Sequence, residues 1–320
     1  MKPKYFKIIF FLLGLLALAV FLGISKGSVS IPIKDLLLGE NRVILYLRIF
    51  RILMAVLSGC GLAVCGIALQ AILRNPLAEP YILGTSSGAG IGAVLVMISG
   101  VSFIYLPLAA FCGAMLSIIL VYNLARQNNK INEHSLILSG VIVSIALSSL
   151  IVFLISTSTK EALQGITWWL WGSLQVYDHE LLALVSLIVF VGIGVIYLFS
   201  QDLNAISLGD EEALHLGIDI DIIKKILIII SSLITAALVC VSGIIGFVGL
   251  IIPHIMRLVV GPNHKILIPV SCLAAAVFMI ICDILSRVIA APFEIPIGVI
   301  TALVGAPAFI ILLKKKQTIK

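Results

Sequence analysis

Residues 226–260 read ILIIISSLITAALVCVSGIIGFVGLIIPHIMRLVV, and this stretch decides the fold class. Over its 35 residues the only acidic or basic side chains are those of His254 and Arg257. A single membrane crossing takes about 20 apolar residues, so the stretch is too long for one span. Because Gly243 and Pro253 interrupt it, we expect two membrane helices joined by a tight turn on the outer side.

The rest of the chain has the same apolar character. Of its 320 residues 61% are hydrophobic and only 11% are charged, and the mean hydropathy is +1.24, which excludes a water-soluble globule. Apolar runs divide the chain into about ten spans, near residues 6–24, 50–72, 81–99, 102–125, 134–156, 181–200, 226–243, 246–260, 266–286 and 297–313. We therefore expect an all-α, polytopic membrane protein with a single transmembrane domain over residues 1–320.

The basic residues indicate how the chain is oriented. With ten spans, fourteen of the 21 lysines and arginines fall on one side of the membrane and seven on the other. Because positive charge concentrates on the cytoplasmic side, both termini are expected in the cytoplasm. The basic residues lie at the ends of apolar runs and not on one face, so we expect contact with membrane lipid and none with nucleic acid.

Several kinds of chemistry find no support in the sequence. The chain has no G-x-x-x-x-G-K-[ST] phosphate-binding run and no H-E-x-x-H zinc motif, and its six cysteines lie in apolar stretches without a C-x-x-C pair. We therefore expect no catalytic residue, no metal site and no cofactor in this chain, and an energy source outside it. A gradient-driven secondary transporter or a channel stays open as an alternative, although intramembrane carboxylates are too few for a convincing proton relay.

A short polar connection follows the second apolar run. Residues 74–80 read RNPLAEP, and Pro76 and Pro80 each disfavour helix at the residue before them. The spacing predicts a stiff, non-helical elbow on the cytoplasmic side, with an ordinary tight turn as the alternative. A tandem G-x-x-x-G pattern over residues 84–92 follows, which predicts close packing of the next helix.

The longest cytoplasmic polar run is residues 201–225, which contains SLGDEEALHLG at 207–217. Ser207 is a candidate cap for a short helix with acidic residues in its first turn, and Gly217 a candidate end. Such a helix outside the bilayer lies in the headgroup layer or inserts into a groove on a partner. Its acidic face favours a partner protein over anionic lipid.

Three arginines are expected at the outer ends of spans. Arg48 and Arg51 are three residues apart and share a helix face, and Arg287 ends the ninth span. Exposed arginines there suit docking of carboxylates on a soluble partner, and snorkelling to the interface is the alternative. Asp283 precedes Arg287 by four residues, which predicts an intrahelical ion pair.

All three tryptophans of the chain, Trp168, Trp169 and Trp171, lie in one outer segment. Indoles concentrate at membrane interfaces, so an aromatic belt is one interpretation. The other is a lining for a large, partly apolar ligand at the outer mouth of a pathway.

Together these segments resemble the permease subunits of type II ABC importers, the family of the iron-siderophore, haem and cobalamin uptake permeases. The resemblance covers essentially the whole chain. The segments that carry it are LRIFR at 47–51, RNPLAEPYILG at 74–84, the loop from Leu208-Gly209 to Leu216-Gly217, GFVGLIIPH at 246–254, EIPIG at 294–298 and TALVGAP at 301–307.

The resemblance implies an assembly of several chains. A homodimer of ten-helix subunits would enclose a path on its two-fold axis, with two cytoplasmic ATPase subunits that use ATP and Mg, and an extracytoplasmic binding protein. A heterodimer with a related chain stays open. The positions that match the family's functional elements are Leu208, Gly209, Asp210, Glu211, Glu212, Ala213, Leu216 and Gly217 for coupling to the ATPase, Asn75, Pro76 and Leu77 for a cytoplasmic gate, and Arg48, Arg51 and Arg287 for docking of the binding protein.

From the resemblance we expect a permease in a bacterial or archaeal cell membrane. It would move an iron chelate (a siderophore or haem) or cobalamin into the cell by alternating access, and an oxyanion is also compatible. Because few intramembrane polar groups are present, the cargo would pass through a large, weakly interacting cavity. Specificity would then reside mainly in the binding protein.

Overall fold

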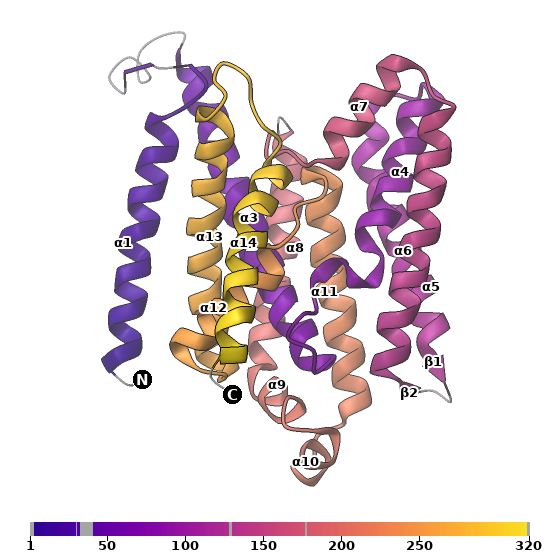
Figure 1. The fold of residues 1–320 in the computed structure, drawn as a ribbon, viewed down its shortest axis with the longest axis vertical. Helices are drawn as coiled ribbons and strands as arrows, with labels where there is room; N and C mark the ends of the chain where they lie inside the picture. Colours follow the sequence, from indigo (N-terminus) through magenta and orange to yellow (C-terminus); the bar gives the residue numbers. More distant parts are fainter. Residues whose placement is uncertain (1–2, 30, 33–40, 128–129, 177, 319–320) are drawn as a thin grey trace.

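The computed structural model describes every residue except 1–2, 30, 33–40, 128–129, 177 and 319–320. The helices form an upright bundle, and both termini lie at the end that carries α9 and α10 (Figure 1). The described part has one small antiparallel pair, β1 (Arg126–Gln127) with β2 (Lys130–Ile131). The all-α class and the location of both termini on one side are as expected.

Each of the ten apolar runs contains one α-helix of the described chain, and the runs 81–99 and 102–125 also begin with a short 3-10 helix. Seven helices are long and apolar enough to cross a membrane: α1 (Pro3–Ser25), α3 (Arg42–Ile72), α5 (Leu106–Ala125, preceded by η3, Phe103–Tyr105), α6 (Glu133–Ser156), α8 (His179–Leu198), α11 (Ile220–Ser242) and α13 (His264–Val288). Three have shorter apolar parts: α4 (Thr85–Ser99), α12 (Val248–Val260) and α14 (Ile297–Thr318), which is apolar over Ile297–Ile311. The remaining helices are η2 (Pro80–Leu83), α7 (Lys160–Leu170), α9 (Ser200–Ile206) and α10 (Asp210–His215).

The stretch 226–260 forms a pair of helices, α11 and α12, but the expected tight turn between them is wrong. Residues 243–247 are non-helical, and α12 has only 13 residues, which is about 20 Å of helix against an apolar core of about 30 Å. The Tyr81 hydroxyl donates to the Ile245 carbonyl and accepts from the Ile245 N–H, both at 3.1 Å. This side chain satisfies backbone groups that lipid could not.

Small residues let the helices approach closely, as the glycine pattern predicts. In α4, Gly88 and Gly92 face the backbone of α5 at Gly113 and Ala109. A side chain at either glycine would collide with those carbonyl oxygens. The tandem G-x-x-x-G pattern is therefore a packing seam between α4 and α5.

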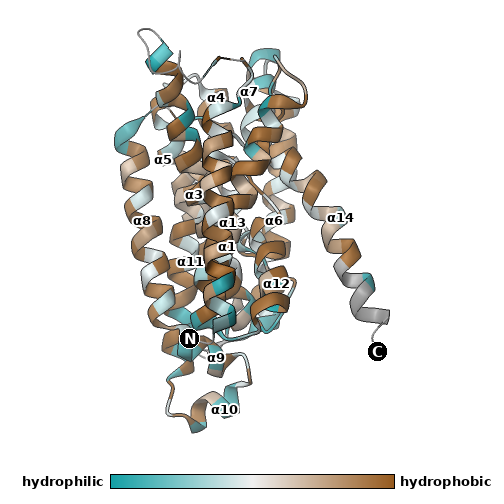
Figure 2. Cartoon of the chain, turned by 90° about the vertical axis from the view of Figure 1, so that its left-hand side faces the viewer, coloured by the Kyte–Doolittle hydropathy of each residue, from teal (hydrophilic) through white to brown (hydrophobic). Residues whose placement is uncertain are grey.

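The long helix α3 is the centre of the bundle and packs against α8, α11, α12 and α13. Gly66 of α3 faces the carbonyl of Gly249 in α12, where no side chain would fit. Figure 1 shows α1 and α13 on one side of this centre and α4, α5 and α6 on the other. Hydrophobic residues predominate along the helices and polar residues gather toward the two ends (Figure 2). Many large hydrophobic side chains of these helices are exposed, which is the pattern of a lipid-facing surface.

Candidate functional site

The elbow between α3 and η2 is non-helical, as its two prolines predict. Oδ1 of Asn75 accepts from the backbone N–H of Leu77 at 2.9 Å, and the Ala78 N–H donates to the Asn75 carbonyl at 3.1 Å. These bonds close a tight turn in which Pro76 and Leu77 are exposed. The gate role assigned to Asn75, Pro76 and Leu77 stays a prediction.

A buried glutamine fixes the elbow to its neighbours. Nε2 of Gln70, near the end of α3, donates to the carbonyls of Ala78 in the elbow and Gly249 in α12, at 3.2 and 3.3 Å. Gln70 of α3 thereby bonds both the elbow and α12. Nothing in the sequence around Gln70 marks this role, because its partners lie eight and 179 residues away.

The loop of residues 201–225 contains two short helices instead of one. Because α9 continues to Ile206, Ser207 is its C-cap and its Oγ donates to the Leu203 carbonyl at 2.7 Å. The expectation that Ser207 caps α10 is therefore wrong, and Gly209, at φ 151°, holds that position. Gly217 has φ 77° just past α10, which confirms it as the end of this helix.

One face of α10 rests on the rest of the chain. Ala213 is fully buried and packs with Ala205, Ile206 and Ile220, which belong to α9 and the start of α11. This small apolar cluster is separate from the core of the bundle. It fixes α10 to α9 and α11 at the cytoplasmic end.

The other face of α10 is unusual for a solvent-exposed surface. Leu214 of α10 is 61% exposed, the flanking Leu208 and Leu216 are 73% and 67% exposed, and Glu211 and Glu212 of α10 are exposed as well. Figure 1 shows α10 projecting beyond the helical bundle. An apolar surface rimmed by carboxylates suits contact with a partner protein.

Four charged side chains meet beside α10, and we call them the cytoplasmic charge cluster: Arg74, Glu133, Asp210 and Lys224. Arg74 binds both Glu133 oxygens, the shortest contact being 2.8 Å from Nη2 to Oε2. Nζ of Lys224 lies 2.7 Å from Glu133 Oε1 and 3.0 Å from Asp210 Oδ1. Hydrogen bonding to Glu133 raises the pKa of Arg74 further above its ordinary value.

A second charged group lies at the outer end, where the structure corrects the sequence interpretation. Arg51 binds Asp283 and also Glu294, the latter at 2.7 Å, and Arg287 binds Asp283 at 2.7 Å. The predicted Asp283–Arg287 pair is confirmed. Asp283 is completely buried and the two arginines nearly so, hence the expected exposure of Arg51 and Arg287 is wrong. The pairs neutralise charges that would be costly within the bundle.

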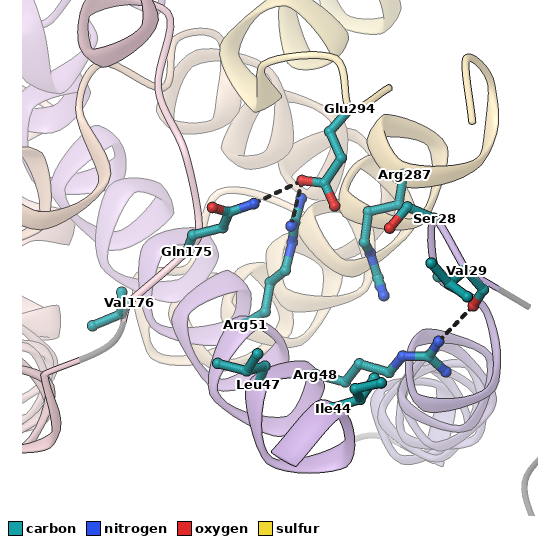
Figure 3. Close-up of a pocket in the computed structure, with 11 residues that line it drawn as sticks. Ser28, Val29, Ile44, Leu47, Arg48, Arg51, Gln175, Val176, Arg287 and Glu294 are labelled. Atoms are coloured by element: carbon teal, nitrogen blue, oxygen red, sulfur yellow. Dashed lines mark hydrogen bonds and ion pairs between the residues drawn. The ribbon is translucent and has the colours of Figure 1, made fainter. Parts of the chain in front are cut away.

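Arg48 is also buried, although it was expected to be exposed. Its guanidinium donates to the carbonyls of Ile24 at 2.6 Å and Val29 at 2.9 Å. Figure 3 shows Arg48, Arg51 and Arg287 converging on one cavity, whose volume is about 250 Å³. The arginines thus line a recess at the outer end, and their docking role stays a prediction.

The tryptophans lie beside this recess. Trp168 and Trp171 are about half exposed and contact each other edge to face, with ring centroids 6.1 Å apart. Trp168 lines a small cavity of about 210 Å³ that it shares with Arg51 and Glu294. The structure brings the aromatic segment next to the arginines, and whether Trp168, Trp169 and Trp171 line a path stays a prediction.

A polar stripe on α6 was not anticipated from the sequence. Ser144, Ser148 and Ser149 line a shallow groove of about 470 Å³ on the outward face of this membrane-crossing helix. Ser144 and Ser148 are four residues apart and share a face, and Ser149 lies next to Ser148 with its Oγ donating to the Ile145 carbonyl at 2.9 Å. The signal was present as an i, i+4 repeat of serines within an apolar run.

The FecCD transport family matches the chain over residues 15–315. The chain belongs to this family. It is 40% identical over 273 residues to the cobalamin import permease BtuC of Halobacterium salinarum, covering 85% of this chain and 73% of that one. It is 33% identical over 318 residues to the Fe(3+) dicitrate permease FecD of Escherichia coli, covering 97% and 98%.

The fold of the chain is also similar to that of a solved transporter structure. A transporter described as metal-chelate type, in an inward-facing conformation, superposes with a TM-score of 0.87 at 35% identity, covering 97% of this chain and 99% of that one. As a FecCD chain, the protein is a multi-pass permease subunit of the cell membrane. It has no ATPase site of its own, and partner subunits hydrolyse the ATP.

Proposed function

We propose that this chain is the permease of an ATP-driven importer whose cargo is a metal chelate, with cobalamin or a ferric chelate such as a siderophore or haem as the class. The observation that carries the proposal is the likeness to a metal-chelate type transporter over nearly the whole chain, with that to a cobalamin permease over 85% of the chain. The permease would carry no cofactor itself, while the partner ATPase subunits would bind ATP and Mg.

The surface of α10 supports contact with an ATPase subunit. Leu208, Leu214 and Leu216 are exposed outside the membrane-crossing helices. Such side chains gain stability only when a partner covers them. We therefore assign residues 208–217 as the coupling element.

The serine stripe of α6 supports a second permease copy. Ser144 and Ser148, one helical turn apart, place two hydroxyls on one face of an otherwise apolar helix, where water would solvate them better than lipid. A water-filled path between two copies would hydrate them. The side chains that line such a path would interact only weakly with the cargo, which suits a bulky cargo that must be released.

The outer recess supports docking of an extracytoplasmic binding protein. Its three arginines outnumber the two carboxylates that pair with them, Asp283 and Glu294, so the described part of the recess keeps a positive balance. An acidic group on the binding protein that reached this recess would be attracted and oriented.

The test is purification of the tagged chain from its native membrane in mild detergent, with mass spectrometry of the partners. We expect an ATPase subunit and a binding protein whose absorbance spectrum is that of a corrinoid or a ferric chelate. Replacing residues 211–217 with a Gly-Ser segment should remove the ATPase, and the exposed Lys225→Met should not. Recovery of the chain alone, or of a binding protein loaded with an oxyanion, would contradict the proposal.

A further inference from the structure

The cytoplasmic charge cluster joins four separate elements of the chain. Arg74 belongs to the elbow, Glu133 to the first turn of α6, Asp210 to the first turn of α10 and Lys224 to the first turns of α11. Two acids and two bases meet there, so the charges balance.

Lys224 is the central member of the cluster. It is only 3% exposed, although a lysine at a membrane surface would normally extend into water. A buried ammonium is costly unless charged partners surround it, and Lys224 has two, Glu133 and Asp210. The adjacent Lys225 is exposed, so the burial of Lys224 is specific.

The bonds form a continuous chain from α10 to the elbow. Asp210 holds Lys224 at 3.0 Å, Lys224 holds Glu133 at 2.7 Å, and Glu133 holds Arg74 through a two-oxygen contact. A direct contact from Arg74 to Asp210 is longer, at 3.8 Å. Bidentate arginine–carboxylate pairs fix orientation as well as distance.

Apolar contacts also tie α10 to its neighbours. Its apolar support comes from Ala213 packing on Ala205, Ile206 and Ile220. These partners lie in α9 and the first residue of α11, so they do not reach the elbow. In the described chain, the charge cluster is the polar route from α10 to the segment around Asn75 and Leu77.

We propose that the cytoplasmic charge cluster is the linkage that carries movement of α10 to the elbow, with Lys224 as its positioning residue. The proposal rests on the proposed function, in which α10 meets the ATPase, and on the predicted gate role of Asn75, Pro76 and Leu77 in the elbow. A displacement of α10 would pull Lys224, turn Glu133 at the start of α6 and shift Arg74. The coupling between α10 and the elbow then depends on the charges of the cluster and not only on the stability of the fold.

The test measures the elbow directly in the complete transporter. Spin labels on Leu77→Cys in the elbow and Leu187→Cys on the exposed face of α8 would report their distance with and without a non-hydrolysable ATP analogue. Lys224→Met removes the central charge and keeps the side-chain length. Glu133→Gln keeps the shape and is the second variant should Lys224→Met fold poorly. Lys225→Met is the matched control.

We expect the nucleotide to change the Leu77–Leu187 distance in the wild type and in Lys225→Met. In Lys224→Met and Glu133→Gln the change should be lost, while the ATPase subunit still co-purifies and its hydrolysis rate stays within about threefold of wild type. An unaltered nucleotide response in both cluster variants would overturn the linkage. Failure of the wild-type chain to bind any ATPase subunit would overturn the proposed function instead.

Discussion

Glu133 and Lys224 stand 91 residues apart in the chain, yet Oε1 of Glu133 lies 2.7 Å from Nζ of Lys224 at the cytoplasmic end of the bundle. The pair joins the starts of α6 and α11, and ion pairs link it to Arg74 of the elbow and to Asp210 of α10. A permease without its own ATPase has to receive force at this end. The pair lies between α10, which is assigned to receive this force, and the elbow, to which we propose the force is carried.

Ala213 should be essential for holding α10 in place. Ala213→Asp would bury a carboxylate against Ile206 and Ile220, which have no polar group to offer it. We expect α10 to detach and at least about tenfold less ATPase subunit to co-purify, with unchanged helix content by circular dichroism. Asp221→Asn, at an exposed position in the first turn of α11, is the control. Normal ATPase recovery with Ala213→Asp would argue against the assigned coupling element.

Tyr81 should stabilise the fold through the non-helical segment after α11. Tyr81→Phe removes a hydroxyl that bonds both backbone groups of Ile245 and leaves them without that partner in an apolar setting. The expected loss in unfolding free energy is about 1–3 kcal/mol. Thermal unfolding in detergent would measure it, with Tyr105→Phe at an exposed site as control. Equal midpoints for the two variants would contradict the assignment.

Gly66 should tolerate no side chain. Gly66→Ala places a methyl group against the carbonyl of Gly249, so α3 and α12 must separate. We expect a loss of about 2 kcal/mol or more, as for overpacked cores. Gly14→Ala in α1 meets nothing within 4 Å and should gain roughly 0.5–1 kcal/mol from helix propensity. If both variants changed the unfolding free energy in the same direction, the contact between Gly66 and Gly249 would not be tight.

Glu79 predicts a pH dependence of stability. Burial raises the pKa of this carboxyl, and the backbone contact with Phe247 only partly lowers it. The folded chain therefore keeps this proton to higher pH than the unfolded chain, in which the pKa of a glutamate is about 4.3. The stability that this carboxyl contributes is fully present below the unfolded pKa and is lost as the pH rises through the folded pKa. Glu79→Gln should remove that fall. Parallel curves of unfolding free energy against pH for wild type and variant would refute it.

Glu294 should weaken docking by competing for Arg51. Glu294→Gln leaves the guanidinium with Asp283 as its remaining carboxylate partner in the recess. We expect the affinity for the binding protein to rise several-fold at low salt, and the gain to shrink as salt screens the attraction. Surface plasmon resonance at two ionic strengths would show this, with the exposed Glu161→Gln as control. A weaker complex for Glu294→Gln would mean that Glu294 itself supports docking.

Features set by nearby residues could be predicted from the sequence. Apolar run length predicted one helix for each of the ten runs, Pro76 and Pro80 predicted the elbow, and Gly217 predicted the end of α10. Each depends on interactions within a few residues. The error at Ser207 arose because the polar residues before it form an additional helix, α9, so Ser207 ends one helix and does not begin the next.

Features that depend on distant residues were not predictable. Arg51 reads as an exposed helix-end arginine until Glu294, 243 residues later, is placed beside it. Lys224 likewise reads as a topology signal at the start of a span, and only the folded chain shows it buried between two carboxylates. Charge alone does not tell a snorkelling residue from one that is paired within the bundle.

The central claim is that partner-driven ATP hydrolysis moves a metal chelate through this chain. The direct measurement is uptake of radiolabelled cobalamin and, in parallel, of ferric citrate or haem by proteoliposomes that contain the permease, its ATPase and its binding protein, with ATP enclosed on the cytoplasmic side. The account predicts uptake of one of these chelates that requires both ATP and the binding protein. Uptake that proceeds without ATP and follows an ion gradient would contradict it.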